Sequence, residues 1–582
     1  MAAGPWDATR AKSRSTPMPD LPASCDLLVI GSGAAGMAAA ISARHHGLNP
    51  VIIEKADVFG GSTAVSGGAI WVPCNPLMQA AGMPDSREAA RTYIRGETGN
   101  HFNAELVEAF LEKGPEAIDF FHNKTALKMS HRPVSPDYHP DADGATEGGR
   151  VLDAYDYDGR RLGENLHRIR PPIADFTILG GLPLGRPDIY HFLHLTRSAK
   201  SAAYATKTVL RYIRDRLTWG RNTRLVMGAA VAGRLAETIF ELGIPLFTGH
   251  ELVKLVQDAS GRITGAEVDG PRGIVGVSAT RGVVLAAGGF PHDTARRKQH
   301  FEHVRKGLPH YSMSPSTGTG GTIAAAEAAG AAFIESNTNG GFWTPVSLLP
   351  NPDGSKRPFP HLFLDRAKPG VIAVGHDARR FVNEASSYHD FVQGLIAKLL
   401  EEGQQSAWLI ADHRALRRYG LGAVHAFPAM IGRHLKNGYL KRGATPGHLA
   451  RECGIDAAQL ERTIAATNAA AAGGKDPQFG KGTTSYQRYL GDAENKPNPC
   501  VRPLEAPFYA IEIFPGDIGT TMGLDITARG EVKRQDGHVV PGLYACGNDI
   551  NSIMSGSYPG PGITLGPALT FGYIVGKTAA TA

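Results

Sequence analysis

Short apolar runs that end in small residues recur along the chain and predict its central sheet. These runs occupy positions 27–30, 51–53, 283–286 and 543–545. Continuous apolar runs of this length are typical of parallel strands that are buried on both faces. Because the last run lies far from the other three in the sequence, we predict an α/β fold whose parallel sheet is built from two separate parts of the chain.

The segment between these parts has a different pattern. Residues 371–374 form a short apolar run, whereas 457–472 are rich in alanine with spaced apolar positions and follow Asp456, a suitable helix N-cap. We therefore predict an α+β catalytic (cap) domain over 297–515, inserted between two parts of a cofactor domain at 19–296 and 516–582. Residues 1–18 are polar and contain proline, which predicts a disordered tail.

Length, charge and cysteine content narrow the class of protein. A chain of 582 residues exceeds the size of a single hydrophobic core, so we expect domains that share a cleft. The net charge of +6 is too dilute over this length to indicate nucleic-acid binding. The five cysteines lack metal-binding or paired redox spacing, and no uncharged apolar run reaches about 18 residues. Residues 1–24 also lack the apolar core of a signal peptide. These features predict a cytoplasmic protein without a metal site.

A basic stretch at 195–225 stands out within an insertion that we place at 148–233. Its only acid is Asp215, and its cations are Arg197, Lys200, Lys207, Arg211, Arg214, Arg216, Arg221 and Arg224. The apolar side chains among them are Tyr204, Leu210, Ile213, Leu217 and Trp219. Two interpretations are open: a solvated helix face, or a helix that lies on an anionic membrane surface.

The first apolar run leads into a glycine-rich motif. Residues 31–36 read GSGAAG. The first glycine of such a motif allows a tight turn, the second lets the backbone approach a pyrophosphate, and the third allows close helix packing. The helix that follows directs its N-terminal N–H groups at the phosphates. Glu54 ends the second run, where an acid accepts ribose hydroxyls. We therefore predict a Rossmann-like dinucleotide site.

A second glycine-rich loop, at 60–68, favours FAD over NAD. Its glycines and hydroxyls can wrap the phosphates and approach one face of an isoalloxazine ring, for which a nicotinamide dehydrogenase has no need. The residues expected to bind FAD are Gly31, Gly33, Ala34, Ala35, Gly36, Glu54, Lys55, Gly61, Ser62, Thr63, Ser66, Gly67, Gly68, Val253, Ala287, Gly288, Gly547, Asn548, Gly562, Thr564 and Leu565. No histidine lies in a typical covalent-flavin context, so we expect the FAD to be non-covalent.

Together these motifs resemble the flavoprotein fold of the fumarate reductase and succinate dehydrogenase superfamily. Within it, residues 558–562 (YPGPG) resemble the Tyr-Pro-Gly-x-Gly turn of the 3-ketosteroid Δ1-dehydrogenases. Residues 135–138 (SPDY) are similar to the segment that brings a tyrosine from the flavin domain of that family. Residues 380–388 (RFVNEASSY) are similar to the segment that brings one from the catalytic domain. The resemblance runs over most of the chain.

The resemblance implies a mechanism for converting a 3-keto-4-ene steroid to a 1,4-diene in steroid degradation. Tyr558 O–H and the Gly562 backbone N–H would bind the 3-keto oxygen and stabilise the developing enolate. Tyr388 would take the proton from carbon 2, which calls for a pKa below the usual value of about 10. Tyr138 would stabilise, by hydrogen bonding, the Tyr388 phenolate that acts as this base. Hydride from carbon 1 would pass to flavin N5, and an external acceptor, a quinone or another, would reoxidise the flavin.

Simpler interpretations stay open. A single tyrosine commonly fills the edge of a core with its hydroxyl at the surface. The Arg-Phe-x-Asn-Glu element at 380–384 serves cap packing across the wider superfamily. Other functions are dehydrogenation at another ketosteroid position, reduction of an enone or a fumarate-like acid, and electron delivery by a membrane-attached flavoprotein. An acid substrate is disfavoured because residues 549–576 contain no arginine, lysine or histidine.

Overall fold

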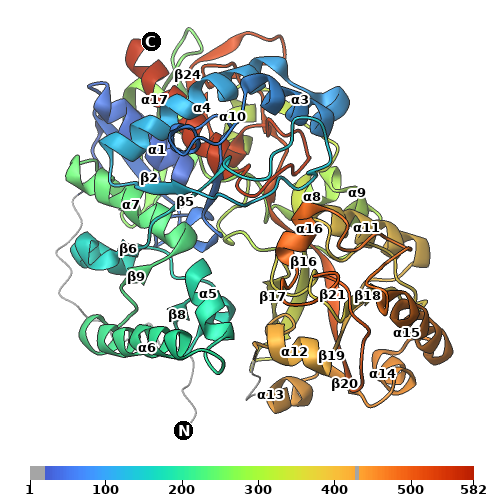
Figure 1. Ribbon diagram of the computed structural model, residues 1–582. Helices are drawn as coiled ribbons and strands as arrows, with labels where there is room; N and C mark the ends of the chain where they lie inside the picture. Colours follow the sequence, from blue (N-terminus) through green and yellow to red (C-terminus); the bar gives the residue numbers. More distant parts are fainter. Residues whose placement is uncertain (1–19, 427–430) are drawn as a thin grey trace.

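The computed structural model describes residues 20–426 and 431–582, which form two lobes (Figure 1). The upper lobe in the figure holds segments from both ends of the chain, and the lower right lobe holds the middle of the sequence. The tail predicted at 1–18 lies outside the described residues.

The first lobe is built on an eight-stranded sheet. Strands β10, β2, β1, β13 and β24 pair in parallel, while β12, β11 and β23 add antiparallel strands. Their bounds are β1 (Ser24–Ile30), β2 (Pro50–Glu54), β10 (Leu246–Thr248), β11 (Glu251–Gln257), β12 (Ile263–Gly270), β13 (Gly273–Leu285), β23 (Glu531–Lys533) and β24 (Val539–Ala545). Because β24 pairs with β13, the C-terminal part of the chain completes this sheet. The predicted discontinuous parallel sheet is confirmed.

Close helix packing joins the two ends of the chain. Helix α1 (Ala34–His45) packs against α17 (Leu565–Thr581). A Cβ at Gly572 would lie 2.6 Å from the Ala35 carbonyl oxygen, and one at Gly576 would lie 2.4 Å from that of Ala39. Both glycines therefore let the helix backbones approach each other. The other elements of this region are α2 (Pro76–Ala80), α3 (Arg87–Thr98), α4 (Ala104–Lys124), α7 (Met227–Glu241), α10 (Gly321–Ala328), β3 (Ala69–Trp71), β4 (Met129–His131), β5 (Val151–Ala154), β15 (Phe333–Ile334) and β22 (Gly523–Leu524).

The second lobe is built on a seven-stranded sheet in the order β17-β16-β21-β19-β18, with β14 and β20 also paired to β21. Its strands are β14 (Tyr311–Ser312), β16 (Gly341–Pro350), β17 (Lys356–Pro360), β18 (Val371–Val374), β19 (Ala407–Asp412), β20 (Lys441–Gly443) and β21 (Phe508–Thr520). Helices that follow or flank them are α8 (Thr294–His300), α9 (Glu302–Arg305), α11 (Tyr388–Glu402), α12 (His413–Tyr419), α13 (Ile431–Lys436), α14 (Pro446–Cys453), α15 (Ala457–Ala471) and α16 (Ser485–Leu490). The boundary predicted at 515/516 falls inside β21, whose pairing with β16 continues to Thr520.

Two helices foreseen from the sequence have clear end signals. Asp456 caps α15 by accepting a hydrogen bond from the Gln459 N–H at 2.9 Å. The basic segment forms α6 (Ala199–Trp219), capped by Ser198 and ended by Gly220 with φ +71°. Helix α6 lies with α5 (Arg186–Leu193) in an extension at the lower left of Figure 1. Short strands complete the extension: β6 (Tyr157–Asp158), β7 (Thr177–Ile178), β8 (Leu182–Pro183) and β9 (Arg224–Leu225).

Among the helices within residues 20–426 and 431–582, none has the length and apolar character needed to cross a membrane. In the same ranges, no three His, Cys, Asp or Glu side chains gather in a group that could hold a metal ion.

Candidate active site

A cavity of about 700 Å³ is lined by residues from both lobes and from the extension. Its first wall is the carboxyl edge of the parallel sheet, where β1, β2 and β13 end. Its second wall carries tyrosines from the loop after β4, from α11, from α16 and from the turn before α17. Carboxyl ends of parallel strands are where open α/β sheets bind ligands.

The glycines of the first motif divide into packing and binding positions. Gly31 has φ +110°, and a Cβ there would lie 2.3 Å from the Ala286 carbonyl oxygen. A Cβ at Gly36 would lie 2.0 Å from the Gly31 carbonyl oxygen. By contrast, a Cβ at Gly33 would meet only Thr63 Oγ1, at 3.8 Å. Gly31 and Gly36 therefore close the turn, while Gly33 presents its backbone to the cavity.

Glu54 is held at the end of β2 by a neighbour that the motif analysis did not single out. Its Oε2 accepts hydrogen bonds from Ser32 Oγ at 2.6 Å and from the Ser32 N–H at 3.1 Å, and its Oε1 accepts one from the Ala56 N–H at 2.9 Å. A carboxylate has about four lone-pair sites, so it can still accept ribose hydroxyls. Ser32 thus orients the acid that the sequence assigned to the ribose.

The cavity is shaped to accept a flat, phosphate-bearing group such as FAD. Gly67 and Gly288 both line it, and a Cβ at either position would meet nothing within 4 Å. Asp549 fixes the loop at Gly288 because its carboxylate accepts from the Ala287 and Gly289 N–H groups, each at 2.7 Å. The chain therefore leaves space for the cofactor at Gly67 and at Gly288, where a side chain would block it.

Most residues predicted to bind FAD line this one cavity. They are Gly31, Gly33, Ala34, Ala35, Glu54, Lys55, Gly61, Ser62, Thr63, Ser66, Gly67, Gly68, Ala287, Gly288, Gly547, Asn548, Gly562, Thr564 and Leu565. Gly36 lies behind the turn, in its packing role. Val253 does not line the cavity; it is 44% exposed on β11, and its neighbour Leu252 lines the cavity instead. The register of β11 against β12 shifts between Leu252 and Lys254, so the direction of the side chain at Val253 follows from the pairing of the two strands.

The three predicted tyrosines meet in one cluster. The ring centroids of Tyr138 and Tyr558 are 5.5 Å apart, those of Tyr388 and Tyr558 are 5.1 Å apart, and those of Tyr138 and Tyr388 are 5.7 Å apart. Tyr486, from α16, was not predicted from the sequence, yet its ring lies 4.7 Å from that of Tyr138. Gly562 lines the same cavity with φ +99°. The structure thus brings together all the residues that the resemblance assigned to catalysis.

A buried ion network fixes the loop that carries Tyr138. Asp137 is fully buried and accepts hydrogen bonds from Trp71 Nε1 and Arg150 Nη1, each at 2.8 Å. Burial is the largest influence on the Asp137 carboxyl and raises its pKa to about 6, although Arg150 opposes the shift. The Tyr138 N–H donates to the Pro559 carbonyl at 2.8 Å. The Asp-Tyr pair is therefore tied directly to the turn that carries Tyr558.

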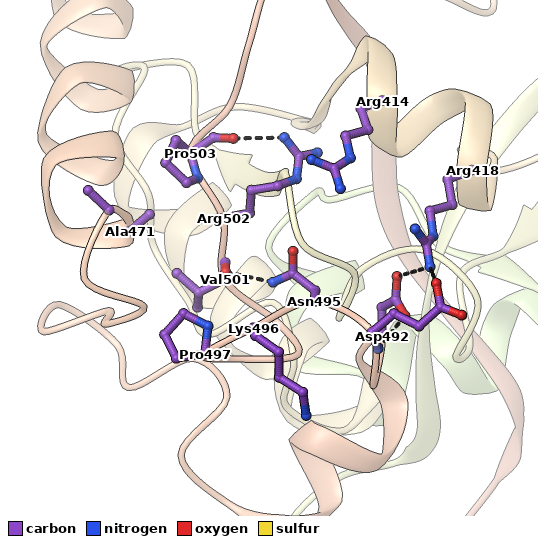
Figure 2. A pocket seen from close by; sticks show the side chains of 12 residues that line it. Arg414, Arg418, Ala471, Asp492, Asn495, Lys496, Pro497, Val501, Arg502 and Pro503 are labelled. Carbon is purple, nitrogen blue, oxygen red and sulfur yellow. Dashed lines mark hydrogen bonds and ion pairs between the residues drawn. The ribbon is translucent and has the colours of Figure 1, made fainter.

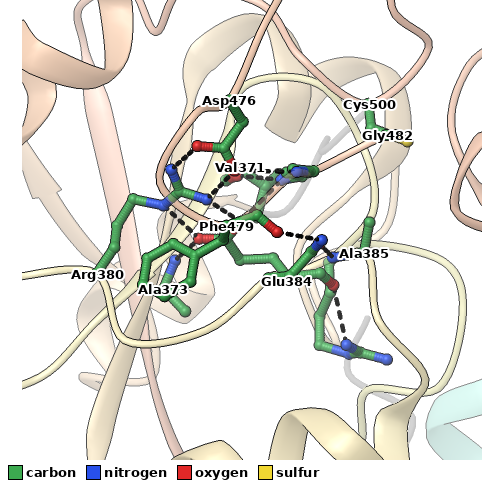
Figure 3. Close-up of polar contacts among 12 residues, drawn as sticks. Val371, Ala373, Arg380, Glu384, Ala385, Asp476, Phe479, Gly482 and Cys500 are labelled. Atoms are coloured by element: carbon green, nitrogen blue, oxygen red, sulfur yellow. Dashed lines mark hydrogen bonds and ion pairs between the residues drawn. The ribbon is translucent and has the colours of Figure 1, made fainter. Parts of the chain in front are cut away.

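A second buried network supports the segment that leads to Tyr388 (Figure 3). Arg380 donates to both carboxylate oxygens of Glu384, at 2.9 and 2.8 Å, and to both of Asp476, at 2.7 and 2.9 Å. Lys481 Nζ lies 3.4 Å from Glu384 Oε2. The cluster crosslinks the core of the second lobe. Arg380 and Glu384 thus contribute to the packing of the second lobe. This is the alternative role that the sequence left open for the Arg-Phe-x-Asn-Glu element.

Burial sets the protonation of the tyrosine cluster. Desolvation is the largest cause that raises the pKa of Tyr388 well above 10, and the neighbouring Tyr138 and Tyr558 add to it. Desolvation also raises the pKa of Tyr138 well above 10 and that of Tyr558 to about 12. The shift of the Tyr388 pKa is therefore opposite in direction to the lowering that the resemblance calls for.

Cations reach the cavity from segments far from Tyr558. Arg132, Arg186 and Lys368 all line it. Arg132 forms a paired contact with Asp153 at 2.7 and 2.6 Å, and Lys368 donates to two backbone carbonyls at 2.7 and 2.8 Å. Arg186 Nη1 is 3.5 Å from Asp153, and its side chain is 40% exposed. Residues 549–576 contain no cation, but the cavity as a whole is lined by cations from other segments.

A separate pocket of about 440 Å³ lies in the second lobe (Figure 2). Its lining includes Arg418, which is paired with Asp492 at 2.8 Å, and Arg502, which is paired with Asp412 at 2.6 Å. None of the predicted site residues lines it. The chemistry indicated by the sequence is therefore confined to the larger cavity.

Comparison with known proteins agrees with this geometry. A model of the FAD binding domain family matches residues 26–565. The chain is 39% identical over 561 residues to the 4-oxocyclohex-2-ene-1-carboxylate 5-dehydrogenase of Sinomonas cyclohexanicum, which covers 96% of this chain and 94% of the relative. It is 34% identical to the 3-oxosteroid 1-dehydrogenase of Mycobacterium tuberculosis strain H37Rv, over 94% of this chain and 97% of that one.

A solved structure gives the same result. The 3-ketosteroid delta1-dehydrogenase from Sterolibacterium denitrificans, solved in complex with 1,4-androstadiene-3,17-dione, superposes with a TM-score of 0.89 at 32% identity and covers 96% of this chain and 100% of that one. The chain thus belongs to the FAD binding domain family and is an FAD-dependent oxidoreductase of the succinate dehydrogenase and fumarate reductase superfamily.

Proposed function

We propose that this enzyme dehydrogenates a cyclic ketone at ring carbons next to the carbonyl, with a 3-ketosteroid converted to its 1,4-diene as the leading reaction. The observation that carries the proposal is the meeting of Tyr138, Tyr388, Tyr558 and Gly562 in the cavity that the dinucleotide edge also lines. These residues come from three distant parts of the chain, and all four line the cavity, where a bound substrate would meet them.

Each residue has a role that fits its place. Tyr558 O–H and the Gly562 N–H would donate to the ketone oxygen and stabilise the enolate as it forms. Tyr388, in its phenolate form, would accept the proton from the adjacent carbon and become a phenol, with Tyr138 next to it as a hydrogen-bond donor. FAD, bound without a covalent link, supplies the hydride acceptor. An external acceptor such as a quinone would then take the electrons.

The wall around the tyrosines is largely apolar, which suits a steroid nucleus. Leu362, Phe363, Leu364 and Leu490 line the cavity from the second lobe, and Phe176 lines it from the extension. Flat apolar ligands are favoured by such a wall because they bury no unpaired polar group. The segment at 148–233 therefore contributes to the substrate site.

Anaerobic mixing of the holoenzyme with androst-4-ene-3,17-dione tests the reaction. We expect the flavin to bleach and a 1,4-diene to appear by mass spectrometry and NMR. A flavin that stays oxidised with a panel of 3-ketosteroids would contradict the steroid proposal. A 4,5-unsaturated product formed from a saturated 3-ketosteroid would move the reaction to another position of the ring.

A second candidate is dehydrogenation of an oxocyclohexene carboxylate. The specific observation in its favour is Arg186, which lines the cavity beside Tyr489 and shares Asp153 with Arg132. Because one carboxylate faces two guanidinium groups, the local charge leaves a cation free to meet an anionic substrate. The 39% identity to an enzyme named for such a substrate agrees with this alternative.

Competing substrates distinguish the two candidates. We would compare kcat/KM for 4-oxocyclohex-2-ene-1-carboxylate and for androst-4-ene-3,17-dione in the same preparation. If the acid is the substrate, Arg186→Gln should lower the acid-to-steroid ratio of kcat/KM by roughly 10-fold or more, since a hydrogen bond to a charged group contributes about 1.5–3 kcal/mol. Arg197→Gln, at an exposed position of the same extension, serves as the control. An unchanged ratio would remove the carboxylate candidate.

We also propose that α6 contacts a membrane surface. Leu210, Ile213 and Leu217 are 61%, 48% and 82% exposed, and their spacing of three and four residues places them on one helix face. Asp215, the acid of the segment, is buried and accepts a 2.6 Å hydrogen bond from Thr223 Oγ1. The helix thus directs its acid inward and its apolar stripe outward, among many cations, which fits an anionic lipid surface.

Flotation with liposomes tests this contact. Replacing Leu210, Ile213 and Leu217 by serine should abolish flotation with anionic liposomes, whereas Ile274→Ser, a change at a 60% exposed position on β13, should not. Flotation that persists in the triple variant would exclude α6 as the contact.

A further inference from the structure

His139 connects two acidic side chains at the border between the lobes. Its Nδ1 is 2.8 Å from Glu97 Oε2, and its Nε2 is 2.9 Å from Asp390 Oδ2. Because ionised carboxylates only accept hydrogen bonds, both ring nitrogens must donate, and the ring is an imidazolium. Burial opposes that charge, but the bonds to Asp390 and Glu97 outweigh it and raise the pKa of His139 to about 10.

One end of this bridge reaches the helix that carries Tyr388. His139 follows Tyr138 directly, and Asp390 lies two residues after Tyr388 in the first turn of α11. Ser387 holds Asp390 in place, because its Oγ donates to Asp390 Oδ2 at 2.7 Å and accepts from the Asp390 N–H at 3.1 Å. A shift of His139 relative to Asp390 would therefore move Tyr138 relative to Tyr388.

The other end reaches the turn that carries Tyr558. The Glu97 carbonyl accepts a hydrogen bond from Ser557 Oγ at 2.6 Å, and Ser557 precedes Tyr558. The Tyr93 hydroxyl, one helical turn before Glu97 on α3, donates to the Pro559 carbonyl at 2.6 Å. Helix α3 is thus fixed to the Tyr558 turn at two points, and Glu97 transmits that position to His139.

We propose that His139 is a positioning residue whose charged bridge between Glu97 and Asp390 sets the relative placement of the tyrosines from both lobes. The inference rests on the function proposed above. His139 is not among the residues that line the cavity, so its effect must pass through the tyrosines. Its side chain is 40% exposed, which means that a replacement removes the bridge without opening a hole in the core.

The test separates positioning from general stability. In His139→Gln, the side chain is uncharged and donates from a single nitrogen, so it cannot replace the two ring nitrogens that face Glu97 and Asp390. We therefore expect kcat to fall by roughly 10- to 100-fold, as for misplaced catalytic groups, with KM changed much less. Asp390→Asn should give a similar loss, and the double variant should lose little more, because both changes break the same bridge. His139→Lys, which keeps a cation between the acids, should recover part of kcat.

Controls keep the result interpretable. His131→Gln, in β4 of the same segment, should match the wild type in kcat; the described part of the chain shows no side-chain hydrogen bond for His131. FAD content and melting temperature identify any variant that fails to fold. A wild-type kcat in His139→Gln, a loss confined to KM, or additive losses in the double variant would overturn the inference.

A failure of the proposed function is distinguishable from a failure of this inference. If the wild type turned over no cyclic ketone, the function would fall. The bridge would then be assessed by amide hydrogen exchange, which should become faster at 135–139 and at the start of α11 in His139→Gln but not in His131→Gln. Unchanged exchange at both places would overturn the bridge itself.

Discussion

The two walls of the cavity are built in opposite ways. The dinucleotide wall consists of glycines and backbone groups that follow one another along the chain, as in residues 31–36 and 60–68. The tyrosine wall consists of large side chains from four separate segments, held by buried ion networks and by His139. A cofactor shared by many enzymes can be bound by a contiguous motif, whereas the geometry of one reaction requires a particular tertiary arrangement.

The largest expected effect concerns the tyrosine wall. Tyr388→Phe should lower kcat by about 10²- to 10⁴-fold, the usual contribution of a general base. Tyr558→Phe should lower it by about 10²- to 10³-fold, the usual effect of losing one donor to the developing oxyanion. FAD content should stay unchanged in both. Steady-state kinetics and flavin absorbance measure both quantities. Tyr190→Phe, a 60% exposed residue that also lines the cavity, is the matched control. A loss of FAD content in parallel with the loss of kcat would mean that the tyrosine substitutions also disturb the dinucleotide wall.

The pH profile tests the protonation of that wall. Because burial raises the pKa of Tyr388 well above 10, only a small fraction of this phenol is ionised at neutral pH. We therefore expect kcat to rise by up to about tenfold per pH unit as the phenolate fraction grows, without a plateau below pH 10. A plateau near neutral pH would show that the bound substrate or cofactor lowers the phenol pKa.

On the dinucleotide wall, Gly33→Ala should weaken FAD binding without unfolding the protein. The added methyl group would meet only Thr63 Oγ1 at 3.8 Å and would project toward the cavity. Displacement of one or two backbone contacts should raise the Kd for FAD by roughly 10- to 100-fold, since each buried hydrogen bond lost costs about 1–3 kcal/mol. Gly276→Ala, at an exposed position of β13 where a Cβ would also meet nothing within 4 Å, is a control for the methyl group. Equal FAD affinity in both variants would contradict the binding role.

Asp549→Asn should have the smallest effect of the set. The amide can accept from only one of the two N–H groups that the carboxylate now holds at 2.7 Å. We expect the free energy of unfolding to fall by about 1–3 kcal/mol, measured by denaturant titration of the apoprotein. The loop at Ala287 should also exchange its amide hydrogens faster. No change in either quantity would mean that the loop keeps its conformation without the two hydrogen bonds to Asp549.

The dependence of protein stability on pH in the alkaline range is a further test of the His139 bridge. The pKa of His139 is raised from 6.5 to about 10 by its two carboxylates, against the cost of burial. A raised pKa means that this stabilisation is complete below pH 6.5 and is lost as the pH rises through about 10. His139→Gln should therefore narrow the difference in melting temperature between neutral and alkaline pH.

The sequence by itself determined the dinucleotide wall. Strand, glycine turn, helix and acid follow in fixed order within residues 26–54, and each step depends on local backbone geometry. For the same reason the helix after Asp456 was foreseen with its cap. The direction of the Val253 side chain has no such local signal, because the register of β11 against β12 shifts at this position.

Only the tertiary structure decided the tyrosine wall and its charges. No local sequence motif marks several residues of the site, because each reaches it through packing between elements that are far apart in the chain. They are Tyr486, Arg132, Arg186, Lys368 and Asp549. The resemblance identified three tyrosines, but the buried surroundings that raise their pKa values arise only when both lobes come together. Local motifs report backbone conformation, while burial and charge at a site depend on long-range contacts.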